Sequence, residues 1–175
     1  MSSVSDLLAH LKPCIIEVEF LGVRYTIPAL DAVEWIALID GPSPDLYEIF
    51  PVLAGRDAVE AVEDALWEGR ADSDAVAQVG LSAIEAAGDR SWWVVLNIIR
   101  SASTAWSIVH VNRAVGMSLA GWLDEVWSKI MEHIDPKKRA GWITEVEKPP
   151  KGLKVEIDYD EEEAAFLAAM NAVMR

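Results

Sequence analysis

The sequence predicts a mainly α-helical α+β fold, in which an N-terminal β-hairpin packs on a bundle of about five to seven helices. The first observation is that residues 15–27 read IIEVEFLGVRYTI, with apolar and polar residues alternating on both sides of Leu21-Gly22. Such alternation indicates half-buried strands, and a two-residue loop ending in glycine favours a hairpin. The second observation is that after Pro28, which closes the second strand, apolar residues recur at helical spacing.

Composition and charge restrict the function classes. The chain has 175 residues, 52% of them apolar and eight of them Trp, which suits one globular domain with an ample core. Its formal net charge is −14. Such a surface repels nucleic acids and anionic lipids, so we expect neither a nucleic-acid partner nor a membrane partner. Cys14 is the single cysteine, which excludes an internal disulfide and a cysteine zinc site.

Two apolar segments lack the features of targeting or membrane signals. MSSVSDLLAHLKP at residues 1–13 carries an acid and no basic region before its short apolar patch, unlike a secretory signal. WWVVLNII at residues 92–99 is far shorter than the roughly 20 residues that a membrane span needs. We therefore expect a soluble cytoplasmic protein.

Residues 31–135 are predicted to form the helices. Asp31 and Glu34 have the spacing of a capping box, and Ser118 can cap a later helix. The stripe after Ser118 is the most regular in the chain: Leu119, Trp122, Leu123, Val126, Trp127, Ile130 and Ile134. Residues 91–115 are almost entirely apolar or small, which is typical of a central helix, and we expect a break near residues 101–104.

A further helix is expected after Asp57. Asp57 and Glu60 repeat the spacing of a capping box. Val59, Val62 and Leu66 follow at helical spacing and predict its buried stripe.

The predicted domain organisation has three parts. Residues 1–136 form the globular domain, and residues 137–154, KKRAGWITEVEKPPKGLK, have the charge and Pro/Gly punctuation of a linker. Residues 155–175 begin with acids, which favour a helix N-terminus, and form an acidic C-terminal helix. The apolar stripe of that helix is Phe166, Leu167, Met170, Val173 and Met174.

No constellation for catalysis or metal binding is found in the sequence. The three histidines, His10, His110 and His133, are far apart and have no cysteine or suitably spaced acid beside them. DYDEEE at residues 158–163 lacks the glycine and the twelfth-position Glu of a calcium loop. No phosphate-binding, dinucleotide-binding or nucleophile motif is present. We predict no catalytic residue, no metal and no cofactor, and therefore not an enzyme.

The candidate partner-binding residues are apolar. The Trp35–Ile39 side of the first helix can cover the hairpin or a partner, and adjacent Trp92 and Trp93 cannot both face one core. The C-terminal stripe either folds back on the domain or docks into a groove of another chain, including a second copy of itself. The full set is Trp35, Ile39, Trp92, Trp93, Phe166, Leu167, Met170 and Met174.

The order of these parts carries a family resemblance. A hairpin runs into YTIPALDAVEWIALI, small Ala-rich helices with acidic caps follow, and a charged tail closes the sequence. The most distinctive pieces are IPAL at 27–30 with Trp35 after it, and VGMSLAGWLDEVW at 115–127. The chain resembles the tail assembly chaperones of long-tailed (siphovirus-type) phages of actinobacteria, in their short, non-frameshifted form. The resemblance covers most of residues 15–135 and rests on arrangement and texture.

The resemblance implies a non-enzymatic assembly factor. Such a chaperone binds and solubilises the tape measure protein and helps tail tube polymerisation, while a longer frameshifted form recruits the tail tube protein. The implied location is the cytoplasm of the infected bacterial host, with little or none in the mature virion, and a homo-oligomer is compatible with this role. No site residue transfers from the family. The alternative is a structural or adaptor protein of the virion, either a head–tail connector or an oligomeric scaffold.

Overall fold

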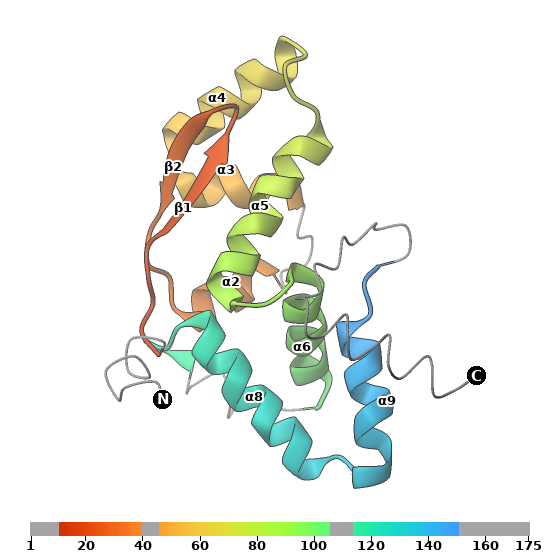
Figure 1. The fold of residues 1–175 in the computed structure, drawn as a ribbon. Coiled ribbons are helices and arrows are strands. Elements are labelled where there is room, and N and C mark those ends of the chain that lie inside the picture. The colour runs from red at the N-terminus through yellow and green to blue at the C-terminus, as the bar shows by residue number, and fades with distance from the viewer. Residues whose placement is uncertain (1–10, 40–45, 106–113, 151–175) are drawn as a thin grey trace, which may run out of the picture.

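The structure, a computed structural model, describes residues 11–39, 46–105 and 114–150 (Figure 1). Within these ranges it contains an antiparallel β-hairpin and seven helices, which confirms the predicted α+β fold class. The elements are β1 (Ile16–Phe20), β2 (Val23–Ile27), α2 (Ala32–Ile39), α3 (Leu46–Ala54), α4 (Arg56–Trp67), α5 (Ser73–Gly88), α6 (Trp92–Ala105), α8 (Leu119–His133) and α9 (Pro136–Glu147).

The hairpin turns through two residues, as predicted. Phe20 pairs with Val23, so Leu21 and Gly22 alone form the loop, with φ values of 50° and 80°. Positive φ at both positions matches the right-handed twist of the strands, and glycine adopts it without strain. One face of the hairpin is buried through Ile16, Val18, Phe20 and Ile27, whereas Val23 at the tip is 52% exposed. The apolar face is therefore satisfied within the chain.

Helix α5 connects the two ends of the molecule. It packs on α3 and β1 at one end and on α6 and α8 at the other (Figure 1). The crossing with α3 is close at Gly80, where an added Cβ would lie 2.9 Å from the carbonyl oxygen of Leu46 and 3.2 Å from Cβ of Ile49. A glycine is needed here because a backbone atom blocks any larger residue.

Aromatic residues fill the space between the hairpin and α3. Phe50 is fully buried, and its ring centroid lies 5.5 Å from that of Phe20 and 5.2 Å from that of Tyr25. The contact with Tyr25 is edge-to-face, one of the arrangements that aromatic quadrupoles prefer. These contacts fix the hairpin on the helices.

The capping box predicted at Asp31 is present. The backbone N–H of Glu34 donates to Oδ1 of Asp31 at 3.1 Å, and the backbone N–H of Asp31 donates to Oε2 of Glu34 at 2.9 Å. Oδ2 of Asp31 also accepts from the N–H of Gly116 at 2.9 Å. The Gly116 N–H, together with amides in the first turn of α2, lowers the pKa of Asp31 below its ordinary value of 3.8, although partial burial opposes this. Asp31 thus joins the start of α2 to the turn before α8.

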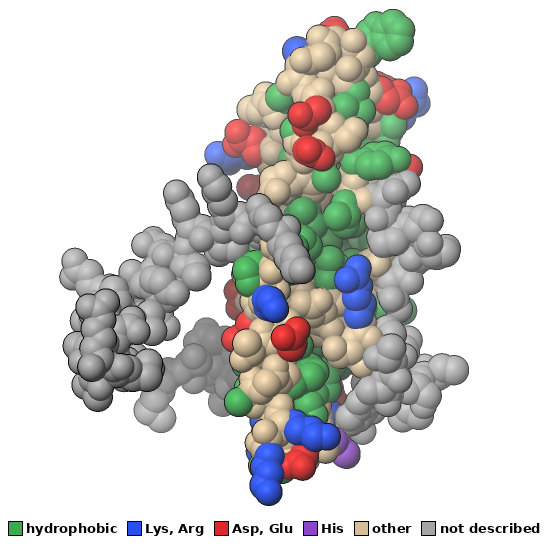
Figure 2. Space-filling model, turned by 90° about the vertical axis from the view of Figure 1, so that its right-hand side faces the viewer, with side chains coloured by type: hydrophobic (Ala, Val, Ile, Leu, Met, Phe, Trp, Pro, Cys, Tyr) green, Lys and Arg blue, Asp and Glu red, His purple; other side chains and the backbone are tan. Residues whose placement is uncertain are grey.

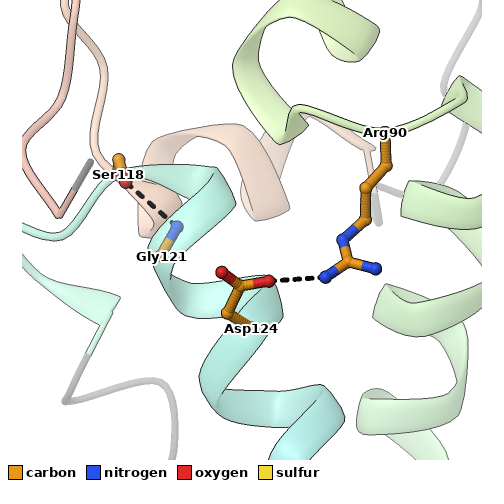
Figure 3. Close-up of polar contacts among 4 residues, drawn as sticks. All are labelled: Arg90, Ser118, Gly121 and Asp124. Atoms are coloured by element: carbon orange, nitrogen blue, oxygen red, sulfur yellow. Dashed lines mark hydrogen bonds and ion pairs between the residues drawn. The ribbon is translucent and has the colours of Figure 1, made fainter. Parts of the chain in front are cut away.

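The cap predicted at Ser118 is also present. Its Oγ accepts from the N–H of Gly121 at 3.0 Å, at the start of α8 (Figure 3). The predicted break at residues 101–104 is wrong, because α6 is continuous from Trp92 to Ala105.

The cap and stripe predicted for α4 are wrong in part. The cap position is Gly55, without a side-chain cap, and Asp57 lies inside the first turn. The buried face consists of Ala58, Val62 and Ala65, whereas Val59 and Leu66 are exposed. Helix α4 lies on α3 through this alanine face, because small side chains allow a close approach and leave the larger ones outside.

The linker predicted for residues 137–154 is wrong over most of its length, because Pro136–Glu147 forms α9. Asp135 caps this helix by accepting the N–H of Lys137 at 2.9 Å, and Pro136 occupies the first turn, where its missing N–H costs nothing. Val146 alone is buried in α9, so the periodicity that identifies a helix from sequence is weak.

Tertiary contacts hold α9 against α6. Nε1–H of Trp93 donates to the carbonyl of Glu147 at 3.1 Å, and Nδ2 of Asn97 donates to the carbonyl of Val146 at 3.0 Å. Both bonds satisfy carbonyl groups at the C-terminal end of α9, which have no partner within a helix.

Two tilted indole rings join α9 to α8. The ring centroid of Trp142 lies 5.0 Å from that of Trp127, and the guanidinium of Arg90 lies 5.5 Å from the Trp127 centroid. Arg90 also forms an ion pair with Asp124 of α8 (Figure 3). The turn between α5 and α6, which carries Arg90, is therefore tied directly to α8, and Trp127 of α8 in turn contacts Trp142 of α9.

Candidate partner-binding surface

Trp35 and Ile39 lie in the core of the molecule. Trp35 is 2% exposed and Ile39 is 6% exposed, and both belong to the buried hydrophobic cluster of the chain. The prediction that they meet a partner is therefore wrong for this fold, because the chain itself supplies their neighbours. The alternative given with it is that this side of α2 covers the hairpin, whereas the main contact of α2 is with α8.

Trp92 and Trp93 are half-buried at the start of α6 and contact other parts of the chain. Their rings meet edge-to-face at 5.7 Å. The backbone N–H of Trp92 donates to Oε1 of Glu85 at 3.1 Å, and Trp93 holds the end of α9 as described above. The structure thus assigns both residues a role in joining helices, and a further contact with a partner stays a prediction.

The remaining candidate residues belong to the C-terminal stripe. Phe166, Leu167, Met170 and Met174 lie outside the described residues, as does the predicted helix at 155–175 that carries them.

Large apolar side chains are exposed mainly on one part of the molecule, which we call the hairpin end and define as β1, β2, α3 and α4. Trp67, the last residue of α4, is 92% exposed. Figure 2 shows hydrophobic side chains beside acidic ones over the upper part of the molecule, where α4 lies in Figure 1. The exposed large apolar residues of the hairpin end are Leu21, Val23, Tyr47, Val52, Val59, Leu66 and Trp67.

The same helix is strongly acidic. Four acids, Asp57, Glu60, Glu63 and Asp64, lie within Arg56–Trp67, against Arg56 alone. Arg56 pairs with Glu60 at 2.8 Å, and both side chains are largely exposed. An exposed pair of this kind adds little stability, so the main property of this face is its negative charge.

Sequence reasoning missed Trp67, although one signal was available. Trp67 comes five positions after the buried Val62, which places it about 140° away around a helix. An aromatic residue that far from the buried face cannot share the core with it.

A concave feature lies between α6 and α9. It is a shallow groove of about 340 Å³ lined by Asn97, Arg100, Ser101, Trp142, Glu145 and Val146. Its lining combines an indole, a valine, one cation, one carboxylate and amide or hydroxyl groups, without a pair of side chains suited to acid–base chemistry. Among the described residues, no three His, Cys, Asp or Glu side chains lie close enough together to hold a metal ion.

The structure and the comparisons give two further findings. None of the helices formed by the described residues has both the length and the apolar character to cross a membrane. No protein-family model, no curated protein and no solved structure matches this chain.

Proposed function

We propose that this chain is a phage tail assembly chaperone, which binds the tape measure protein, keeps it soluble and helps tail tube polymerisation. Two independent arguments support the proposal. The first is the resemblance of residues 15–135 to that family, carried by IPAL at 27–30 and VGMSLAGWLDEVW at 115–127. The second, which carries most weight, is the exposure of Trp67 and other large apolar side chains on an acidic, well-packed body.

A chaperone that holds an apolar client needs two surface properties together. It must offer apolar contact area, because burial of apolar surface drives association in water. It must also carry enough net charge to keep the complex dissolved, and a net charge of −14 serves that purpose. In this proposal the chain works in the cytoplasm of the infected host, and a longer frameshifted form brings the tail tube protein.

Co-expression tests the proposal. The chain is produced together with fragments of the tape measure protein encoded beside it, and an unrelated acidic protein of similar size replaces it in the control. We expect the soluble yield of a fragment to rise with this chain and not with the control, and the fragment to co-purify with the chain. Fragments that stay insoluble beside abundant soluble chain would contradict the chaperone function.

Purified particles separate the chaperone from a structural or adaptor protein of the virion. A connector or scaffold remains in the particle at a fixed number of copies, whereas a chaperone leaves. Quantitative mass spectrometry of mature virions is therefore expected to find little or none of this chain. A constant stoichiometry across preparations would favour the adaptor instead.

A further inference from the structure

We propose that the exposed face of α4, together with Val52 of α3, docks a cationic amphipathic helix of a partner polypeptide, with leucine-like residues on one side and Lys or Arg beside them. The inference rests on the proposed function, because it names the client-binding surface and the chemistry of the client segment. We call this surface the α4 face and define it by Val52, Val59, Leu66, Trp67 and the acids of α4.

The apolar part of the α4 face has the layout of a helix-binding site. Val59 and Leu66 are seven residues apart, so they lie on one side of α4 about 10 Å apart along its axis. Trp67 follows at the end of the helix, and Val52, 62% exposed, lies shortly before the corner at Gly55. A row of this length fits two turns of an opposing helix, and an exposed Trp is a favoured anchor of such contacts.

Trp67 contributes little to the chain's own packing, and Val59 and Leu66 are only partly covered by it. Helix α4 is anchored through Ala58, Val62 and Ala65, which are buried. Leu66 is 40% exposed and Trp67 stands almost wholly in solvent. Their apolar area is therefore available for burial by another molecule.

The charges of the α4 face select a cationic occupant. Glu63, four positions after Val59 and three before Leu66, lies beside the apolar row, while Asp57 and Asp64 lie further round the exposed side of α4. These three acids form no ion pair within the part of the chain that the structure describes, and Arg56 is already paired with Glu60. A Lys or Arg beside an apolar stripe would neutralise Glu63 while the stripe covers Val59 and Leu66. A nucleic acid would be repelled by the same carboxylates.

A second copy of this chain is a poorer occupant than a cationic helix. In a two-fold dimer through the α4 face, each acid would meet the acids of an identical face, because such an interface pairs one patch with itself. The like charges would oppose association unless a cation intervened. The charge pattern therefore favours a different polypeptide.

Peptide binding tests the inference. The probe is a fluorescein-labelled 20-residue peptide of Leu and Lys at helical spacing, followed by fluorescence anisotropy. The comparison peptides are a Leu/Glu peptide with the same spacing and a scrambled Leu/Lys peptide. We expect the Leu/Lys peptide to bind the full chain at least tenfold more tightly than either comparison peptide, and to bind more weakly as salt increases.

Two variants of the α4 face and one control sharpen the test. Trp67→Ala and the double variant Glu63→Lys/Asp64→Lys are each expected to weaken binding at least tenfold, the double variant with a reduced salt dependence. Val115→Ala, a change at a 69% exposed apolar residue outside the α4 face, is expected to stay within twofold. Circular dichroism melting establishes that each variant is folded.

Three results would overturn the inference. Equal binding of the Leu/Lys peptide to wild type and Trp67→Ala would show that the α4 face is not the site. Equal binding of the Leu/Glu peptide would remove the charge argument. Sedimentation showing a wild-type dimer that Trp67→Ala dissociates would assign the α4 face to a second copy.

The two proposals fail separately. If Trp67→Ala still solubilises the tape measure fragment, the chaperone function stands, and the assignment of the α4 face as the client-binding surface is wrong. If the Leu/Lys peptide binds as expected but the fragment stays insoluble beside wild-type chain, the α4 face is a site for cationic helices, and the tape measure protein is not its client.

Discussion

Tryptophan has opposite roles at the two ends of the molecule. One is the hairpin end, and the other is built from α6, α8 and α9. We call the second region the tryptophan end. There Trp93 donates to a carbonyl of α9, and Trp127 contacts both Trp142 and Arg90. At the hairpin end Trp67 is 92% exposed. An indole with a polar partner and ring neighbours stabilises the fold, whereas an indole left in water among acids is available for a partner.

Charge separates the two ends as well. Helix α4 carries four acids against one base, while α9 begins with Lys137, Lys138 and Arg139. The net charge of −14 is therefore not spread evenly. A cationic partner is attracted to the hairpin end and is not attracted to the first turn of α9.

The largest expected effect distinguishes a core tryptophan from a surface tryptophan. Trp35→Ala should lower the free energy of unfolding by about 3–5 kcal/mol, because it leaves a large cavity in the core. The matched Trp67→Ala variant should change it by no more than about 0.5 kcal/mol. Urea unfolding at pH 7 measures both. Similar losses in the two variants would contradict the contrast between a tryptophan that holds the fold together and one that is left in water.

An intermediate effect is expected where α5 crosses α3. Gly80→Ala should destabilise the chain by about 1–3 kcal/mol, because the new Cβ would lie 2.9 Å from the carbonyl oxygen of Leu46. Gly141→Ala is the control at the tryptophan end, since a Cβ there meets nothing within 4 Å in α9. It should gain about 0.5–1 kcal/mol from helix propensity. Thermal melting measures both.

Each part of this pair can fail on its own. A neutral Gly80→Ala would show that α3 and α5 separate easily at the crossing. A destabilising Gly141→Ala would contradict a helical α9 and restore the linker predicted for that segment.

The smallest effect concerns the junction between the two ends. Asp31→Asn keeps one side-chain oxygen for the cap but loses an acceptor for Gly116, and should cost up to about 1 kcal/mol at neutral pH. The pKa of Asp31 is lowered in the folded chain, so its carboxylate contributes stability that is present above pH 3.8 and is lost as the pH falls through the lower folded value. The difference in free energy of unfolding between wild type and Asp31→Asn should therefore shrink as the pH falls from 6 to 3.

Urea unfolding at pH 6 and at pH 3 checks this dependence, and both values avoid the isoelectric point near 4.5. If the difference in free energy of unfolding between wild type and Asp31→Asn is the same at both pH values, the charge of Asp31 makes no contribution to stability.

The local features of the fold could be predicted from the sequence, and the tertiary ones could not. The hairpin turn at Leu21-Gly22 and the caps at Asp31 and Ser118 depend on residues close together in the chain, and all three are present. Helix α9 depends on contacts from Trp93 and Asn97, about fifty residues earlier. Its own sequence has only a weak apolar stripe, which explains why it resembled a linker.

The candidate surface was harder to predict than the fold. A helical stripe shows which residues share a face but not which face of a helix is buried. The pattern therefore leaves Trp35 as a candidate for a partner although it is buried within the chain, and it places Leu66 inside although α4 packs through Ala58 and Ala65. Identifying Trp67 required the orientation of α4 on α3, which no local pattern supplies.

The unequal exposure of the tryptophans gives the molecule an optical reporter. An indole in water emits at longer wavelength and is more accessible to a collisional quencher than one enclosed by apolar side chains. Trp67 and Trp35 represent these extremes among the described residues. The difference between the emission spectra of wild type and a Trp67→Phe variant would isolate the exposed indole, so occupancy of the α4 face could be followed without a label.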